Sequence, residues 1–152
     1  MLIFGKIICN YNPESMKKLI FSSKPFALDF ALALLRIGSA AMMLTHGWAK
    51  IADFTNKLGT FRDPLGVGPA VSLQLAIFSE FFCAILLLLG FMTRVCLLPL
   101  GFTMFVAAFM VHADDPFASK EKALLFLLIF VVLSITGPGR LSLDAQINRK
   151  RY

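Results

Sequence analysis

The chain has 152 residues, of which 58% are hydrophobic and 16 are phenylalanine, and its formal net charge is +6. Its mean hydropathy of +0.77 excludes an ordinary soluble domain, because a domain of this size has too little interior to bury so much apolar surface. The positive charge does not indicate nucleic-acid binding, since the basic residues flank apolar runs and form no stripe with exposed aromatic residues.

Four apolar runs are long enough to cross a bilayer, which takes about 20 residues of helix. In chain order they cover residues 26–46, 69–91, 94–112 and 116–136. Residues 1–25 precede them as a leader, and residues 148–152 form a basic tail. We therefore predict an all-α integral membrane protein, with a four-helix bundle in one domain at residues 26–147.

The basic residues predict the orientation of the bundle. Of the 15 lysines and arginines, nine lie on the side of the two termini, including one where the second run turns into the third, and five lie on the other side, in residues 47–68 or near the start of the fourth run. The positive-inside rule then places both termini in the cytoplasm. The remaining basic residue, Arg36, lies inside the first run.

Arg36 and Glu80 are strong charges near the middle of predicted spans. A charge at the bilayer centre costs several kcal/mol, so such a residue is expected to face the protein and have a partner. Arg36 is ten residues from the start of its run and Glu80 eleven from the end of its own, which puts both near the midplane. We predict a buried ion pair, which either fixes the helix register or serves a ligand or proton path.

A second polar group is predicted at the outer ends of the spans. His46 ends the first span and Lys50 follows it, His112 ends the third span, and Glu121 lies near the start of the fourth. These residues could cap helix ends in water, or form a pocket for a small molecule or for the head of a lipid-soluble one. A metal site is the third possibility, but the two histidines come from different helices without HxxxH spacing, so no metal is predicted. The three cysteines form no CxxC motif, which counts against a dithiol mechanism.

The order of these motifs resembles the DoxX-like family of small four-helix membrane proteins. The matching elements are LLRIG (34–38), HGWAK (46–50), FSEFFCAILLLLGFMTR (78–94), His112, Glu121 and GPGRLSLD (137–144). The resemblance implies a bacterial cytoplasmic membrane protein, and some members of the family are linked to quinone-dependent redox complexes. By position it implies the candidate residues Arg36, His46, Lys50, Glu80, Arg94, His112 and Glu121.

Two functions compete at this point. The first is a non-catalytic accessory subunit of a membrane complex, for example a quinone-linked redox complex, which associates with other membrane subunits or with itself. The second is a component that binds a quinone or a similar amphiphile through the pocket of His46, Lys50, His112 and Glu121. The chain carries no CxxCH haem motif and no flavin fingerprint, so a partner or a quinone must carry any electrons.

Overall fold

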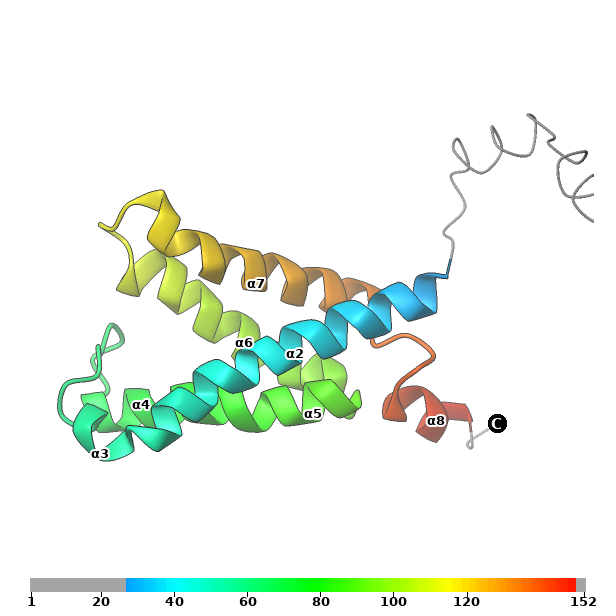
Figure 1. The fold of residues 1–152 in the computed structure, drawn as a ribbon, viewed down its shortest axis with the longest axis horizontal. Coiled ribbons are helices and arrows are strands. Elements are labelled where there is room, and N and C mark those ends of the chain that lie inside the picture. Colours follow the sequence, from blue (N-terminus) through cyan, green and yellow to red (C-terminus); the bar gives the residue numbers. More distant parts are fainter. Residues whose placement is uncertain (1–26, 150–152) are drawn as a thin grey trace, which may run out of the picture.

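The computed structural model describes residues 27–149, and the predicted leader and most of the basic tail lie outside them. All regular structure within this range is helical (Figure 1). Three helical runs, Leu28–Ala52, Pro69–Leu89 and Thr93–Val111, have the length and hydropathy to cross a membrane. A fourth helix of 20 residues, α7 (Phe117–Thr136), has three charges near its start. The all-α prediction is therefore confirmed.

The first long helix, α2 (Leu28–Ala52), runs six residues beyond its predicted end. Its buried side chains recur every three or four residues, which is the period of one helix face; they are Leu32, Ala33, Arg36, Ser39, Ala40, Met43 and Gly47. The short helix α3 (Phe54–Lys57) follows directly. Lys50 therefore belongs to the last turn of this helix, two residues before its end, rather than to a connection.

We call each of the four long helical runs a rod, numbered in chain order. The second rod is continuous but changes its helical winding in the middle. It comprises α4 (Pro69–Ile77), a π-helical segment η2 (Phe78–Cys83) and α5 (Ala84–Leu89). A π-helical turn takes in one extra residue, so side chains after it are rotated relative to a regular helix. Glu80 lies inside η2 and is therefore positioned by this irregular turn.

The third run also combines an α-helical part with a π-helical segment. It begins as α6 (Thr93–Val106), contains Pro99, and ends in a second π-helical segment, η3 (Ala107–Val111). The Thr103 hydroxyl donates a hydrogen bond to the Pro99 carbonyl at 2.9 Å. His112 follows η3 immediately. Two of the predicted polar positions, Glu80 and His112, thus lie within or directly after a π-helical segment.

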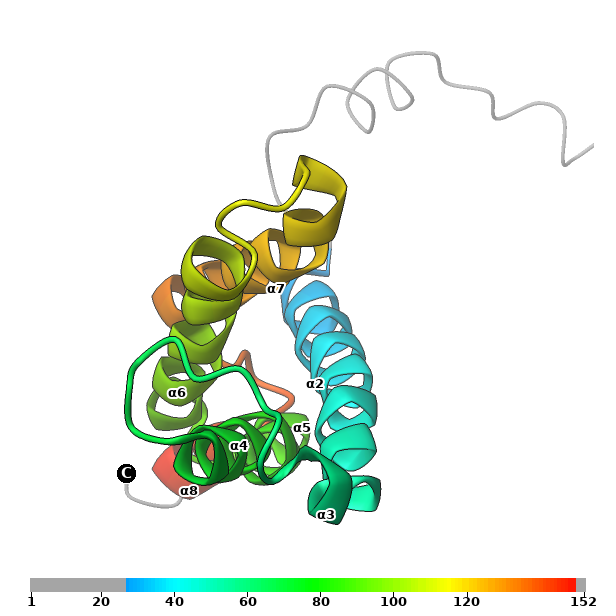
Figure 2. The same cartoon turned by 90° about the vertical axis from the view of Figure 1, so that its left-hand side faces the viewer.

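The connection between the second and third runs is a tight turn at residues 90–92. Gly90 and Met92 both have left-handed backbone angles, with φ of 69° and 49°. The two rods leave this turn as a hairpin: α6 packs against α5 and η2, and separates from α4 further along. Figures 1 and 2 show the resulting opening between α4 and α6 at the end of the molecule where α3 lies. We call this end the α3 end.

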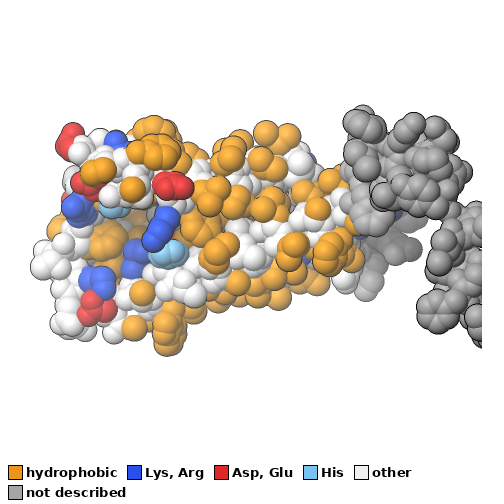
Figure 3. All heavy atoms as spheres, turned by 45° about the horizontal axis from the view of Figure 1, so that its top comes forward, with side chains coloured by type: hydrophobic (Ala, Val, Ile, Leu, Met, Phe, Trp, Pro, Cys, Tyr) orange, Lys and Arg blue, Asp and Glu red, His pale blue; other side chains and the backbone are white. Residues whose placement is uncertain are grey.

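The opposite end carries α8 (Leu143–Arg149), which lies beside the end of α5 and the turn that follows it (Figure 1). We call it the α8 end. The core between the two ends is apolar and built from all four rods; its fully buried large side chains include Met43, Leu73, Leu87, Leu100, Phe130 and Leu133. Charged side chains gather at the α3 end, whereas apolar side chains cover the middle of the surface (Figure 3).

Candidate functional site

Arg36 is buried at the α8 end, against the turn between the second and third rods. Its Nη1 donates hydrogen bonds to the carbonyls of Leu87 (2.8 Å) and Leu88 (2.7 Å), and its Nη2 donates to Leu141 (2.7 Å). Carbonyl groups in the last turn of a helix lack regular partners within the helix and carry partial negative charge. The guanidinium therefore completes the end of α5 and ties it to the segment before α8.

The turn and the α8 segment are shaped around this guanidinium. A Cβ atom at Gly90 would lie 2.6 Å from Arg36 Nη1, so only glycine fits there. Asp144 accepts hydrogen bonds from the backbone N–H groups of Met92 (2.8 Å) and Thr93 (2.9 Å). Burial acts to raise the pKa of Asp144, but these hydrogen bonds outweigh it and the pKa is lowered. The GPGRLSLD motif thus closes the α8 end and has a structural explanation.

The predicted ion pair between Arg36 and Glu80 is wrong. Both residues are buried, as expected, but they extend toward opposite ends of the bundle. Arg36 donates to backbone carbonyls instead, and these meet the need of a buried guanidinium for acceptors without a charged side chain. Glu80 instead pairs with Lys50, a residue predicted to stand in the outer pocket.

The Lys50–Glu80 pair joins the first rod to the second. Lys50 Nζ lies 2.5 Å from Glu80 Oε2, with side-chain exposures of 19% and 6%. The pair forms because α2 and η2 approach closely at Gly47, where a Cβ atom would lie 2.8 Å from the backbone carbon of Glu80 and from Phe81 Cβ. A buried pair of this kind resists the loss of either partner, because the other charge is then left alone in an apolar environment.

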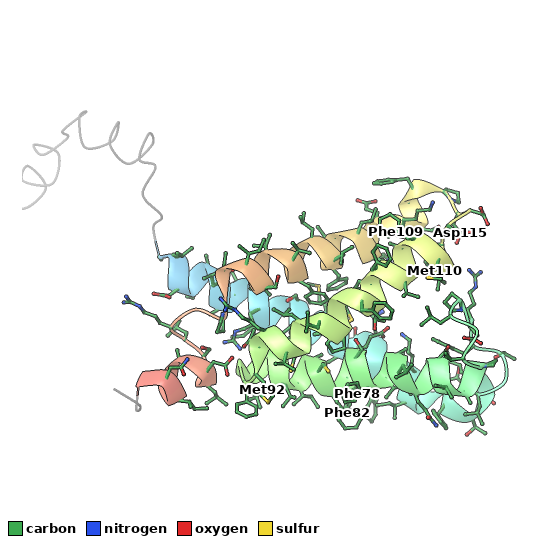
Figure 4. The ribbon with its side chains drawn as sticks, turned by 180° about the vertical axis from the view of Figure 1, so that it is seen from behind. Phe78, Phe82, Met92, Phe109, Met110 and Asp115 are labelled. Carbon is green, nitrogen blue, oxygen red and sulfur yellow. The ribbon has the colours of Figure 1, made fainter. Side chains whose placement is uncertain are left out.

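A cavity of about 640 Å³ lies beside this pair, in the opening between α4 and α6. Its walls are mainly apolar and include Leu75, Phe78, Phe102 and Val106. Phe78 and Phe102 are also 54% and 56% exposed, so they stand at the rim where the cavity meets the membrane-facing surface. Figure 4 shows Phe78 on the outer side of the second rod. The cavity thus opens sideways between two membrane-length helices.

The cavity also has a polar part. Lys50, Glu80 and His112 line it, together with Ser79 and Thr103. The Ser79 side chain is 1% exposed, and its Oγ has no hydrogen-bond partner among the described residues. A buried hydroxyl without a partner is costly, so Ser79 is a candidate contact for a bound polar group.

The connection between α3 and α4 covers this polar part of the cavity. Arg62 reaches from it to the end of the third rod, where its Nη1 donates to the Val111 carbonyl at 2.5 Å. Asp63 holds the connection in shape by accepting hydrogen bonds from Ser72 Oγ (2.7 Å) and from the backbone of Gly68 (2.6 Å). The bond from Ser72 is the main reason that the pKa of Asp63 is lowered.

His112 is held by a carboxylate. Its Nδ1 lies 2.6 Å from Asp115 Oδ2, and Asp115 lies beyond η3 at the α3 end (Figure 4). The hydrogen bond with His112 lowers the pKa of Asp115, so the carboxylate is ionised near neutral pH and acts only as an acceptor. Nδ1 must therefore carry the proton that it shares with Asp115.

The other two predicted pocket residues do not line the cavity. His46 is exposed and packs edge-on against Phe126 of α7, with ring centroids 6.1 Å apart. Glu121 is exposed on α7. The structure therefore brings Lys50 and His112 to one cavity but leaves His46 and Glu121 outside it, because they stand on faces of α2 and α7 turned away from the α4–α6 opening.

Several cavity residues were not predicted from the sequence. Arg62 and Ser79 were missed because one lies in an irregular connection and the other is an ordinary small residue within an apolar run. Only the neighbouring Glu80 offered a signal for Ser79. Within residues 27–149, no group of three or more His, Cys, Asp or Glu side chains is placed to hold a metal ion.

Comparison with known proteins gives consistent relatives. The DoxX family model matches residues 31–113. The chain is 34% identical over 131 residues to inner membrane protein YqjF of Escherichia coli, covering 80% of this chain and 95% of that protein. It is 33% identical over 132 residues to an uncharacterized protein of Haemophilus influenzae, covering 80% and 93% respectively. No solved structure matches the chain. On the family match and the coverage of these relatives, the chain is a DoxX-family inner membrane protein.

Proposed function

We propose that the protein binds the polar head of a membrane-soluble amphiphile of the quinone class, as a subunit of a membrane redox assembly. The observation that carries the proposal is the cavity itself, whose apolar walls open between α4 and α6 and whose far part holds a buried ion pair. A molecule that diffuses within the bilayer can enter such a site sideways. Its ring and tail would contact the apolar walls while its head meets the polar groups.

The residues present fit the head of a quinone. Lys50 provides ammonium donors for a carbonyl oxygen, and Glu80 neutralises the lysine in the buried setting. Ser79 Oγ adds a buried hydroxyl that has no protein partner within the described range. A bound quinone would supply the capacity to accept electrons and protons. The protein's own residues would orient the head and keep it out of bulk water.

The orientation proposed from the charge distribution puts this site on the outer side of the membrane. Nine of the 15 basic residues lie on the side of the termini, which supports cytoplasmic termini. The α3 end and its cavity would then face the periplasm. Replacing exposed Asn56 of α3 with cysteine tests this, because a membrane-impermeant maleimide should label Asn56→Cys in intact cells. Labelling only after lysis would reverse the orientation.

A pair of matched substitutions tests the ligand site. Ala107 lines the cavity and Ala41 lies exposed on α2 away from it. Ala107→Phe should fill the cavity, whereas Ala41→Phe adds the same ring elsewhere. The probe is a short-chain ubiquinone analogue added to protein in lipid nanodiscs, and the readout is quenching of Trp48, the single tryptophan of the chain.

We expect saturable quenching in the wild type and in Ala41→Phe, and loss of the saturable component in Ala107→Phe. Equal quenching in all three proteins would reject the cavity as the site. The protein would then be better described as a non-catalytic accessory subunit, which predicts a stoichiometric protein partner after mild purification regardless of the cavity.

A further inference from the structure

Resting on the proposed function, we infer that this site takes a hydroxyl-bearing aromatic amphiphile, a phenol or hydroquinone, whose hydroxyl donates a hydrogen bond to His112 Nε2. The inference names which chemical form of ligand the cavity selects. It depends on His112 and Asp115, whereas the proposed function depends on the cavity and the Lys50–Glu80 pair.

The first step is the state of the His112 ring. Asp115 Oδ2 lies 2.6 Å from Nδ1 and accepts its proton. In the neutral imidazole the proton on Nδ1 leaves the lone pair on Nε2, which makes Nε2 an acceptor.

The second step is the direction in which that nitrogen is available. His112 lines the cavity, and Nε2 makes no hydrogen bond to any residue between 27 and 149. The cavity lining also includes Lys50, which is paired with Glu80. The cavity therefore offers an acceptor from the third rod and a donor from the first. A ligand head that carries a hydroxyl on an aromatic ring can donate its hydrogen to the acceptor on the third rod.

The third step is the backbone that holds the acceptor in place. The segment from Val111 to Asp115 is tied down from two sides: Arg62 donates to the Val111 carbonyl at 2.5 Å and Lys120 donates to the Ala113 carbonyl at 2.6 Å. The imidazole is thus fixed by its carboxylate and by two anchored carbonyls around it. A fixed acceptor in an apolar cavity discriminates well against a ligand that lacks the matching hydrogen.

The chain offers a direct spectroscopic test, because His46 and His112 are its only two histidines. Protein labelled with nitrogen-15 at histidine, in nanodiscs at about pH 8 where an ordinary imidazole is neutral, is titrated with para-octylphenol or with its O-methyl ether. We expect His112 to show the tautomer protonated at Nδ1, and its Nε2 signal to shift with the phenol but not with the ether. His46, which lies outside the cavity, should not respond to either.

Binding measurements on variants provide the second arm. Relative to partitioning into empty nanodiscs, the wild type should prefer the phenol over its ether by roughly three- to tenfold, which is the range for one hydrogen bond. His112→Phe should abolish the preference, and Asp115→Asn should reduce it, while His46→Phe leaves it unchanged. Referring each ligand to its own partitioning into empty nanodiscs removes the difference in their solubility in lipid.

The outcomes separate the two hypotheses. If both ligands bind with equal preference and Ala107→Phe blocks both, the inference about His112 is wrong and the cavity remains a ligand site. An unmoved Nε2 signal at saturating phenol would also overturn the inference, even if His112→Phe failed to fold. If Ala107→Phe blocks neither ligand, the proposed function and this inference fail together.

Discussion

The close approach of α2 to η2 at Gly47 allows a prediction whose size follows from the structure. A Cβ atom at Gly47 would lie 2.8 Å from three atoms, the Glu80 carbon, the Phe81 nitrogen and the Phe81 Cβ. Two of these are backbone atoms and cannot rotate away, so Gly47→Ala has to push the first and second rods apart. Gly38, on the same helix, provides the control, because nothing lies within 4 Å of a Cβ at that position.

Two opposing contributions set the magnitude. Replacing a mid-helix glycine by alanine stabilises a helix by about 0.5–1 kcal/mol, and this gain should appear alone in Gly38→Ala. At Gly47 the overpacking costs about 1–3 kcal/mol and falls at the upper end because backbone is in the way. The gain in helix stability is common to both variants, so their difference is the overpacking cost alone. We therefore expect Gly47→Ala to be less stable than Gly38→Ala by about 2–3 kcal/mol.

The assay is reversible unfolding of each variant in mixed detergent micelles, followed by helical circular dichroism. The Lys50–Glu80 pair lies within one helical turn of Gly47, so Gly47→Ala should also weaken probe binding in the cavity, while Gly38→Ala should not. Equal stability of the two variants would refute the close approach of α2 and η2 and, with it, the geometric reason for the ion pair.

Three further predictions concern the polar groups at either end. Arg36→Met should lower the free energy of unfolding by about 3–5 kcal/mol, because buried carbonyls lose a charged donor, and Arg36→Lys should recover only part of it in the same assay. Lys50→Met or Glu80→Leu alone should destabilise more than the double substitution, since each single change strands a buried charge; a double-mutant cycle measures this, and additive losses would contradict the pair. The lowered pKa of Asp63 stabilises the fold above its unfolded pKa of about 3.9, and that contribution disappears as pH falls through the lower folded value. Asp63→Asn should therefore flatten the stability profile between about pH 5 and pH 2, as unfolding measured across that range would show.

Much of the fold follows from local sequence. The second, third and fourth helical runs begin and end within two residues of their predicted bounds, because a bilayer-length apolar run and its flanking glycine or proline are both properties of neighbouring residues. The turn at Gly90 follows for the same reason. The first helix is the exception. The polar residues of HGWAK predict its end, but α2 continues to Ala52 because nothing in HGWAK breaks a helix.

The candidate site was only partly predictable. Lys50 and His112 were placed at the correct end and do line one cavity, whereas His46 and Glu121 occupy other faces. Depth along a helix can be counted from sequence, since each residue adds about 1.5 Å. The direction in which a side chain points around the bundle cannot be counted from sequence, because it depends on how the rods cross. It also depends on the π-helical turns at η2 and η3, which rotate the side chains that follow them about the helix axis.

The pairing of charges was decided by tertiary structure alone. The sequence by itself determined that Arg36 and Glu80 lie in apolar helices and need partners, because an unpaired charge there is costly. Which partners they found depended on groups that no sequence pattern marks: the backbone carbonyls beside Gly90 for Arg36, and a lysine brought near by the missing side chain of Gly47 for Glu80. Hydropathy is a local property of a segment, whereas a hydrogen bond between residues 51 or 105 positions apart exists only once the rods have packed.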